Sequence, residues 1–189
     1  MRSVADLIYT CNVSLDGFLE DDRGSLDFTA PHDDVFAFIT GLERSAGTYL
    51  YGRRMYEAMA VWETDPRLRA QSELMADFAD MWLAADKVVY STTLDGVATA
   101  RTRLERAFDP DAIRALKGSA GGHLTVGGAN LARQAFEAGL VDECRLFVHP
   151  VVVGGGKPAL PRGMRFGLEL VDQERFSGGV VYLRYRSAI

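Results

Sequence analysis

The sequence predicts an α/β fold with one mixed, mostly parallel sheet, helices on both of its faces, and an antiparallel hairpin at its C-terminal end. Short apolar segments alternate with helical patterns over the first three quarters of the 189 residues, which is typical of parallel strands joined by right-handed crossovers. The last quarter lacks a helical pattern, so its strands are expected to pair antiparallel. With 48% hydrophobic and 25% charged residues, the chain has the composition of one folded domain over residues 1–189.

The predicted strands are apolar, β-rich segments bounded by turn residues. The first covers residues 4–13 and leads into Asp-Gly and Arg-Gly turn signals. The next strands alternate with helices and are expected at residues 47–52, 86–91, 123–127 and from Glu143 onward. A short edge strand is expected inside residues 100–108. Residues 168–176 and 180–187 are two further strands, which Ser177-Gly178-Gly179 joins as a hairpin.

The predicted helices begin at capping residues or directly after strands. The capping residues are Asp33, Asp65 and Asp109, and the last two precede a proline at the first helical position. One continuous helix is expected from Pro66 to residue 82, and Gly118 is expected to end the helix that Asp109 begins. Two more helices are expected to begin at Arg53 and after Gly128.

The charge pattern argues against a nucleic-acid partner. The 21 Lys and Arg and the 26 Asp and Glu give a net charge of −5, and the two signs are mixed along the chain. No basic run is present that could follow a phosphate backbone. The sequence also lacks a signal-peptide pattern and any apolar run of about 18 residues that could cross a membrane. We therefore expect a cytoplasmic protein without a membrane partner.

The cysteines and histidines show no metal-binding pattern. Cys11 and Cys144 lie in apolar strand segments, where buried free thiols are expected rather than a disulfide. His32, His123 and His149 are spread over different elements without metal-ligand spacing, and His149 is expected to be a hydrogen-bonded core residue. The H-x-E and P-C-x-x-C motifs of zinc deaminases do not occur. The sequence therefore predicts no metal site.

Three predicted strand ends carry residue types that bind phosphate. They are Gly52-Arg53-Arg54, Ser91-Thr92-Thr93 and Gly127-Gly128-Ala129-Asn130. In an open α/β sheet the carboxyl ends of parallel strands form the ligand crevice, where helix N-termini present free N–H groups. Taken singly, each stretch is more typical of an ordinary turn or helix start, and the last fits neither the G-x-G-x-x-G nor the P-loop pattern. The combination indicates a nucleotide cofactor.

The chain resembles the dihydrofolate reductase-like superfamily over nearly its whole length. The matching motifs, in family order and spacing, are VSLDGFLED, YGRRMYEAM, VVYSTT, LTVGGANLARQAFEAGLVDE and FVHPVVVGGGKPALP. The chain is most similar to the C-terminal reductase domain of the bifunctional deaminase-reductase of riboflavin biosynthesis and to the stand-alone bacterial relatives of that domain. The resemblance implies a three-layer fold, with the sheet between helical layers, and NADPH as the cofactor.

The resemblance also implies which motif residues bind the cofactor. The diphosphate residues are Gly127, Gly128, Ala129, Asn130 and Leu131, and Gly52, Arg53 and Arg54 hold the phosphates from the other side. Ser91 and Thr92 match the positions that face the adenosine 2′-phosphate, together with Arg53. Such hydroxyls and a cation favour NADPH over NADH, because a 2′-phosphate needs donors and positive charge. The loop from Asp16 to Leu19 is implied to lie near the nicotinamide.

The candidate substrate-side residues end the first strand and begin the first helix. They are Asn12, Ser14 and Asp16 on the strand side and Asp33, Asp34 and Phe36 on the helix. Asp16 and Asp33 are the candidate catalytic carboxylates, because the resemblance implies an acidic residue on this helix and a loop beside the nicotinamide. Ordinary structural roles are the alternative: Asp16 as the first residue of an Asp-Gly turn, Asp33 as a cap and Phe36 as core.

We therefore expect an NADPH-dependent reductase of a small heterocycle, either pterin- or folate-like or similar to a pyrimidine riboflavin precursor. A non-catalytic nucleotide- or ligand-binding module on the same fold is the alternative, and a flavin-linked or xenobiotic-reducing activity is a third hypothesis. The glycines from Gly154 to Gly156 lead to Pro158 rather than to a helix, so they are interpreted as a connecting loop. Family members commonly pair through the late strands, so a homodimer is expected.

Overall fold

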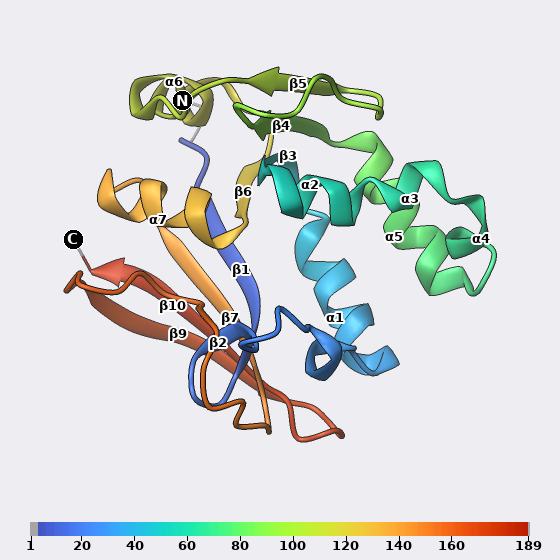
Figure 1. Cartoon of the computed structure of the whole chain (residues 1–189), viewed down its shortest axis with the longest axis vertical. Coiled ribbons are helices and arrows are strands. Elements are labelled where there is room, and N and C mark those ends of the chain that lie inside the picture. The colour runs from blue at the N-terminus through green and yellow to red at the C-terminus, as the bar shows by residue number, and fades with distance from the viewer. Residues whose placement is uncertain (1–3, 189) are drawn as a thin grey trace.

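The computed structural model describes residues 4–188, which form a large twisted sheet with helices on both sides (Figure 1). Within this range the sheet has eight strands in the order β5-β4-β3-β6-β1-β7-β10-β9. Their bounds are β1 Leu7–Ser14, β3 Ala46–Gly52, β4 Asp86–Tyr90, β5 Thr102–Glu105, β6 His123–Gly127, β7 Glu143–His149, β9 Gly167–Arg175 and β10 Val181–Ala188. The pairs from β5 to β7 are parallel, and β10 is antiparallel to both β7 and β9. The predicted mixed sheet and C-terminal hairpin are confirmed.

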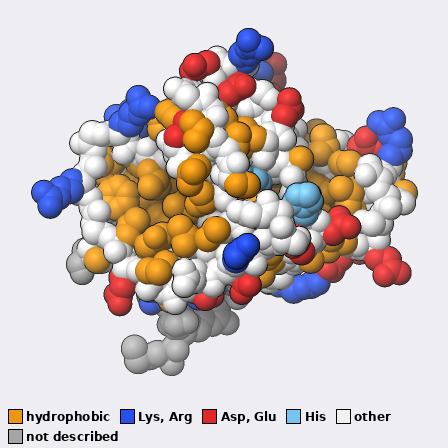
Figure 2. Space-filling view, turned by 90° about the horizontal axis from the view of Figure 1, so that it is seen from below, with side chains coloured by type: hydrophobic (Ala, Val, Ile, Leu, Met, Phe, Trp, Pro, Cys, Tyr) orange, Lys and Arg blue, Asp and Glu red, His pale blue; other side chains and the backbone are white. Residues whose placement is uncertain are grey.

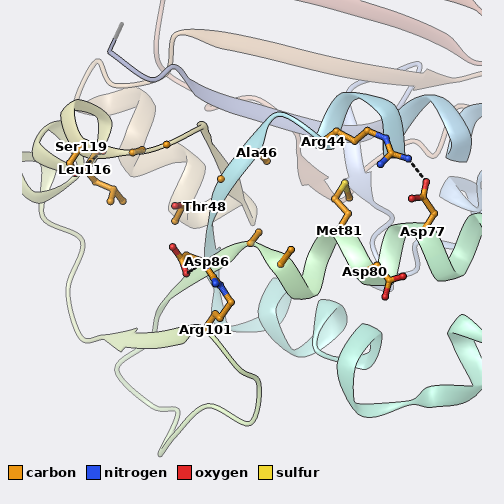
Figure 3. A pocket seen from close by; sticks show the side chains of 15 residues that line it. Arg44, Ala46, Thr48, Asp77, Asp80, Met81, Asp86, Arg101, Leu116 and Ser119 are labelled. Carbon is orange, nitrogen blue, oxygen red and sulfur yellow. Dashed lines mark hydrogen bonds and ion pairs between the residues drawn. The ribbon is translucent and has the colours of Figure 1, made fainter. Parts of the chain in front are cut away.

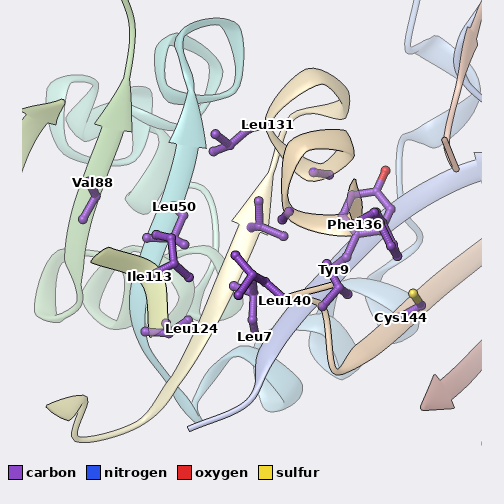
Figure 4. Close-up of a cluster of buried hydrophobic side chains, with 14 residues drawn as sticks. Leu7, Tyr9, Leu50, Val88, Ile113, Leu124, Leu131, Phe136, Leu140 and Cys144 are labelled. Carbon is purple, nitrogen blue, oxygen red and sulfur yellow. The ribbon is translucent and has the colours of Figure 1, made fainter. Parts of the chain in front are cut away.

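Two helical layers cover the sheet because successive strand residues point to opposite faces. The helices are α1 Asp33–Glu43, α2 Arg53–Met59, α3 Val61–Thr64, α4 Pro66–Arg69, α5 Glu73–Ala84, α6 Pro110–Ser119 and α7 Ala129–Glu137. On β3, Leu50 packs with Ile113 of α6 and Leu131 of α7 (Figure 4). Its neighbours Tyr49 and Tyr51 pack on the other face with the aromatic residues of α5. The sheet therefore lies between two helical layers, as the resemblance implies.

Helix α1 begins at Asp33, as expected, but its N-cap differs from the prediction. The N-cap position is occupied by His32, whose side chain makes no capping hydrogen bond, and Asp33 is the exposed first residue of the helix. The neighbouring Asp34 accepts hydrogen bonds from the backbone N–H and the hydroxyl of Ser177, at 3.2 and 2.8 Å. Because Ser177 lies in the β9–β10 turn, a distant segment contacts the first turn of α1. A local capping pattern contains no information on such a contact.

Two other helix boundaries are also corrected. The helix expected from Pro66 to residue 82 is interrupted, because the hydroxyl of Ser72 accepts a hydrogen bond from the backbone N–H of Met75 and caps a new helix, α5. Asp65 does cap α4, by accepting from the N–H of Arg67. Gly118 lies inside α6, which ends at Ser119. The Asp109 cap of α6 is confirmed, since its carboxylate accepts from the N–H of Asp111.

A second, two-stranded sheet joins the loop after β1 to the glycine-rich loop after β7. Its strands are β2 Phe18–Glu20 and β8 Lys157–Pro158, which pair antiparallel. A Cβ atom on Gly155 would lie 2.8 Å from the Asp22 carboxylate, and one on Gly156 would overlap the carbonyl of Glu20. The loop can approach this closely only because these two positions are glycines. The predicted connecting loop is thus confirmed, and it also holds the loop after β1 in place.

The structure agrees with the expectations for Cys144 and His149, whereas Cys11 is less buried than expected. Cys144 is buried, Cys11 is half-buried, and both are free thiols. His149 is 4% exposed, and its Nε2 lies 2.9 Å from Oδ1 of Asn12. Among residues 4–188, no helix has the length and apolar character needed to cross a bilayer.

Candidate functional site

Two adjoining cavities open at the carboxyl ends of the parallel strands. The first, here named the polar cavity, has a volume of about 550 Å³ and is lined by residues 52–55, 90–93, 106–108 and 128–131 with Gln134 and Lys157. The second, named the central cavity, has about 440 Å³ and is lined by residues 9–12 and 127–129 with Leu19, Glu20, Gly24, Leu26, Thr29, Arg54, Met55, Ala58 and Lys157. They share Arg54, Met55, Gly128, Ala129 and Lys157. One continuous cleft therefore crosses the sheet edge.

The glycine pair between β6 and α7 lines the cleft, with Gly128 where the two cavities meet and Gly127 in the central cavity. Gly128 has a φ of +98°, a conformation that side-chain-bearing residues rarely adopt. A Cβ on Gly127 would lie 3.0 Å from both Met55 and the Tyr51 ring. Gly128 is also the N-cap of α7 and provides no side-chain cap, so the first N–H groups of this helix stay available to a ligand. Gly127 is therefore required for packing and Gly128 for the backbone turn.

The predicted phosphate-binding residues come together around the polar cavity. Gly52, Arg53, Arg54, Ser91, Thr92, Gly128, Ala129, Asn130 and Leu131 all line it, and Gly127 lines the central cavity. Arg53 is held by Glu57 at 2.8 Å and donates to the Thr93 hydroxyl at 2.9 Å. The hydroxyl of Ser91 already accepts from the N–H groups of Thr93 and Leu94. These contacts shape the turn after β4 and place the Arg53 guanidinium beside it.

Sequence reasoning missed two cations of this site, Arg106 and Lys157. Arg106 directly follows β5, as Ser91 directly follows the paired strand β4. Because the carboxyl ends of parallel strands form the ligand crevice, this position could have been predicted from the sequence. Its guanidinium donates to the carbonyls of Leu94 and Ser91, at 2.7 and 3.1 Å. Lys157 is brought to the cleft by the pairing of β8 with β2. No local sequence signal indicates that pairing.

Two of the three candidates at the end of β1 lie outside the cleft. Asn12 lines the central cavity, whereas Ser14 and Asp16 line a separate cavity of about 350 Å³ beside it. Asp16 accepts hydrogen bonds from the Ser14 hydroxyl at 2.7 Å and from the N–H of Gly154 at 2.8 Å. These bonds, that from Ser14 first, lower the pKa of the Asp16 carboxyl. Asp16 thus links the loop after β1 to the loop after β7.

The candidates on α1 do not line the cleft. Asp33 and Asp34 are exposed, and the Asp34 carboxylate is engaged by Ser177. The hydrogen bonds of Ser177 lower the pKa of Asp34. Phe36 stacks on Trp62, with the ring centroids 6.0 Å apart, and belongs to the aromatic core. None of the three lines the polar or the central cavity.

The carboxylate that does line the central cavity is Glu20 of β2, which the sequence did not indicate. Its Oε1 lies 2.9 Å from Nζ of Lys157 and 3.7 Å from the Arg54 guanidinium. Leu19, predicted for the loop near the nicotinamide, lines the same cavity. Among residues 4–188, no group of three or more His, Cys, Asp or Glu side chains is arranged to hold a metal ion.

A larger cavity, of about 670 Å³, lies at the opposite edge of the sheet, where β3 and β4 begin (Figure 3). Its charged side chains are already paired: Arg44 with Asp77, Arg69 with Asp80, and Arg101 with Asp86. None of the predicted site residues lines it. The amino ends of parallel strands also lack the free helix N-termini that favour ligands at the carboxyl ends.

The sheet order and the cleft at the strand ends define a dihydrofolate reductase-like α/β protein. A family model described as the RibD C-terminal domain matches residues 5–182, and the chain therefore belongs to that reductase-type family. It is 29% identical over 181 residues to the uncharacterized protein YyaP of Bacillus subtilis (strain 168), covering 95% of this chain and 93% of that protein.

Solved structures agree with the fold. A putative riboflavin biosynthesis protein from Shewanella sp. PV-4 is similar with a TM-score of 0.76 and 19% identity, over 97% of this chain and 99% of that one. Dihydrofolate reductase from Enterococcus faecalis, in a complex with NADP(H), is similar with a TM-score of 0.65 and 13% identity, over 100% of both chains. The family resemblance and the dihydrofolate reductase-like fold are thus confirmed.

Proposed function

We propose that the protein is an NADPH-dependent reductase of a small heterocyclic substrate with a pterin-like or pyrimidine-like ring. The observation that carries this proposal is the continuity of the two cavities. The polar cavity, with its cations and a free helix N-terminus, meets the central cavity, which is similar in volume. The nicotinamide ring and a substrate could stack in the central cavity. Membership of a reductase-type family supports the same activity.

The residues of the polar cavity fit a dinucleotide. The diphosphate would lie at the N-terminus of α7, where Gly128 leaves the helix N–H groups free. A 2′-phosphate would lie beside Thr92 and the Arg53 guanidinium, which Thr93 and Glu57 hold in place. A cation and hydroxyls there favour NADPH over NADH, since the 2′-hydroxyl of NADH has no charge to neutralise.

The central cavity fits the reacting rings. NADPH would supply the hydride when bound. Leu19, Leu26, Met55 and Ala58 form apolar parts of the wall and would exclude water from the stacked rings. Asn12, whose Oδ1 is held by His149 at 2.9 Å, would offer its amide group to the substrate. The role of these residues is positioning, which is the main contribution that a protein makes to hydride transfer.

A non-catalytic binding module remains the second candidate, and one observation favours it. Neither Asp33 nor Asp34 lines the central cavity, so the acidic residue that the resemblance implies on this helix is not at the reacting rings. A titration followed by NADPH fluorescence tests the first step of the proposal. We expect saturable binding at micromolar NADPH and weaker binding of NADH, and no binding up to millimolar NADPH would contradict the proposed reductase.

Turnover separates the two candidates. The purified protein would be incubated with NADPH deuterated at the transferable position and with a panel of oxidised pterins and aminopyrimidines. Deuterium in a reduced product would establish a reductase. Tight NADPH binding without transfer to any member of the panel would instead support the binding module.

We also propose that the chain forms a homodimer through an apolar surface beside β7. Leu15 and Val152 are 65% and 66% exposed, and Leu146 and Val148 line the neighbouring 350 Å³ cavity. In Figure 2, hydrophobic side chains gather on the side of the molecule where β9 and β10 lie. Exposed apolar patches of this kind support association. Light scattering should give the mass of a dimer, and Val152→Glu should shift it to the monomer; a monomeric wild type would contradict the proposal.

A further inference from the structure

One carboxylate and two cations meet at the junction of the polar and central cavities. Nζ of Lys157 lies 2.9 Å and the Arg54 guanidinium 3.7 Å from the same atom, Oε1 of Glu20. Lys157 and Arg54 line both cavities, whereas Glu20 lines only the central one. The two cations therefore act on whatever occupies either half of the cleft.

Lys157 is held at this junction by the backbone. It pairs with Glu20 across the β2–β8 ladder, and the preceding Gly155 and Gly156 pack against residues 20–22 so closely that a Cβ atom would clash. Its side chain is 32% exposed, compared with 75% for Arg54. Of the two cations, Lys157 is the one that the fold places and partly shields from water.

The charge of the central cavity follows from its lining residues. Tyr9 and Cys11 also line it, but burial raises the pKa of both, that of Cys11 to about 12, so both are uncharged near neutral pH. The remaining ionisable side chains that the structure describes there are Glu20, Arg54 and Lys157. One negative and two positive charges leave the cavity with a net charge of +1.

We propose that Lys157 makes this site discriminate between the two redox states of its cofactor, so that NADPH binds more tightly than NADP⁺. The inference rests on the proposed function, with the nicotinamide in the central cavity. The oxidised ring carries a positive charge and the reduced ring carries none, so a cation in a partly dry cavity opposes only the oxidised form. The phosphates are the same in both forms, and their attraction to Lys157 cancels from the comparison. Glu20 moderates the effect, and the oxidised product is released more readily.

Calorimetric titration of the full chain with NADPH and with NADP⁺ tests this inference through the ratio of the two Kd values. Lys157→Met should reduce the preference for NADPH about tenfold, mainly through tighter binding of NADP⁺. Lys157→Arg keeps the charge and should keep the ratio, and Glu20→Gln should increase the preference. Arg162→Met is the matched control, because Arg162 carries the same charge nearby but lines neither cavity.

The outcomes separate this inference from the proposed function. Failure of the wild type to bind either nucleotide would overturn the proposed function. If the wild type instead binds both nucleotides, with a ratio of Kd values that neither Lys157→Met nor Arg162→Met changes, that result would overturn only the role of Lys157. If Lys157→Met does not fold, Glu20→Gln tests the inference in its place. A preference for NADPH over NADP⁺ that does not increase in Glu20→Gln would contradict the inference.

Discussion

The carboxylate of Asp16 accepts hydrogen bonds from the backbone N–H groups of Val153 and Gly154, at 3.2 and 2.8 Å, and so joins the loop after β1 to the loop after β7. The Ser14 hydroxyl donates to the same carboxylate and accepts from the N–H of Phe18. Two loops that border the central cavity are therefore joined by this side chain as well as by the β2–β8 pairing.

Replacement of Asp16 by Ala should loosen the loop after β7. Amide hydrogen exchange should speed up at residues 153–154, while the control Asp27→Ala, on an exposed carboxylate, should leave it unchanged. The pKa of Asp16 is lowered in the folded chain, so its ionised form stabilises the fold above the unfolded pKa. That contribution should be lost as the pH falls through the folded pKa. Unchanged exchange in Asp16→Ala would show that the β2–β8 pairing alone holds the loop.

Gly128→Ala should destabilise the protein by about 1–3 kcal/mol, because an L-residue is strained at a φ of +98°. NADPH binding should weaken with it, since the turn sets the position of the α7 N-terminus. Gly118→Ala is the control: Gly118 lies inside α6 with open space around it, so this change should stabilise by about 0.5–1 kcal/mol. Urea unfolding measures the change in stability of both variants. If Gly128→Ala leaves the stability unchanged, the backbone conformation at this position does not require glycine.

Arg53→Met should weaken NADPH binding about tenfold and NADH binding much less, because only NADPH carries the 2′-phosphate. The comparison uses fluorescence titration of both nucleotides. Arg67→Met serves as the control, since Arg67 is an exposed arginine of α4 that pairs with Asp65 and lines neither cavity. Equal losses for NADPH and NADH would place Arg53 at the diphosphate instead.

Glu43→Gln should stabilise the protein increasingly as the pH rises. Glu43 is 7% exposed at the end of α1, and its Oε2 has no hydrogen-bond partner among residues 4–188. Burial raises its pKa, although Arg145 opposes the shift. The folded state then binds more protons than the unfolded state above about pH 4, so the wild type loses stability as the pH rises toward the folded pKa. Thermal unfolding of both proteins across this range should show a growing difference in Tm; a constant difference would contradict the assignment.

Local patterns were sufficient for most of the fold. Alternating segments such as 47–52 and 86–91 contain enough periodicity to define buried strands, and the helix-free tail defines the hairpin. The errors concern helix caps and boundaries rather than the elements themselves. At the start of α1, Asp33 does not cap the helix and Asp34 binds the distant Ser177. The break before α5 depends on a local serine cap inside a strongly amphipathic segment.

The same distinction applies to the site. Gly52, Arg53, Ser91 and Gly128 follow strands in a regular order, so topology brings them together around the polar cavity. The substrate side is less regular, because the residues that border it come from loops. Glu20 and Lys157 meet only through the β2–β8 pairing, and no periodicity in the sequence predicts a two-residue strand.

The position of β1 in the sheet has a consequence for synthesis of the chain. β1 is made first, but its partners β6 and β7 begin only at His123 and Glu143. Until the ribosome has produced those segments, the apolar residues Leu7, Ile8 and Tyr9 have no strand to pair with. Such non-local pairing slows folding and exposes unpaired strand edges, so newly made chains should bind chaperones through this segment.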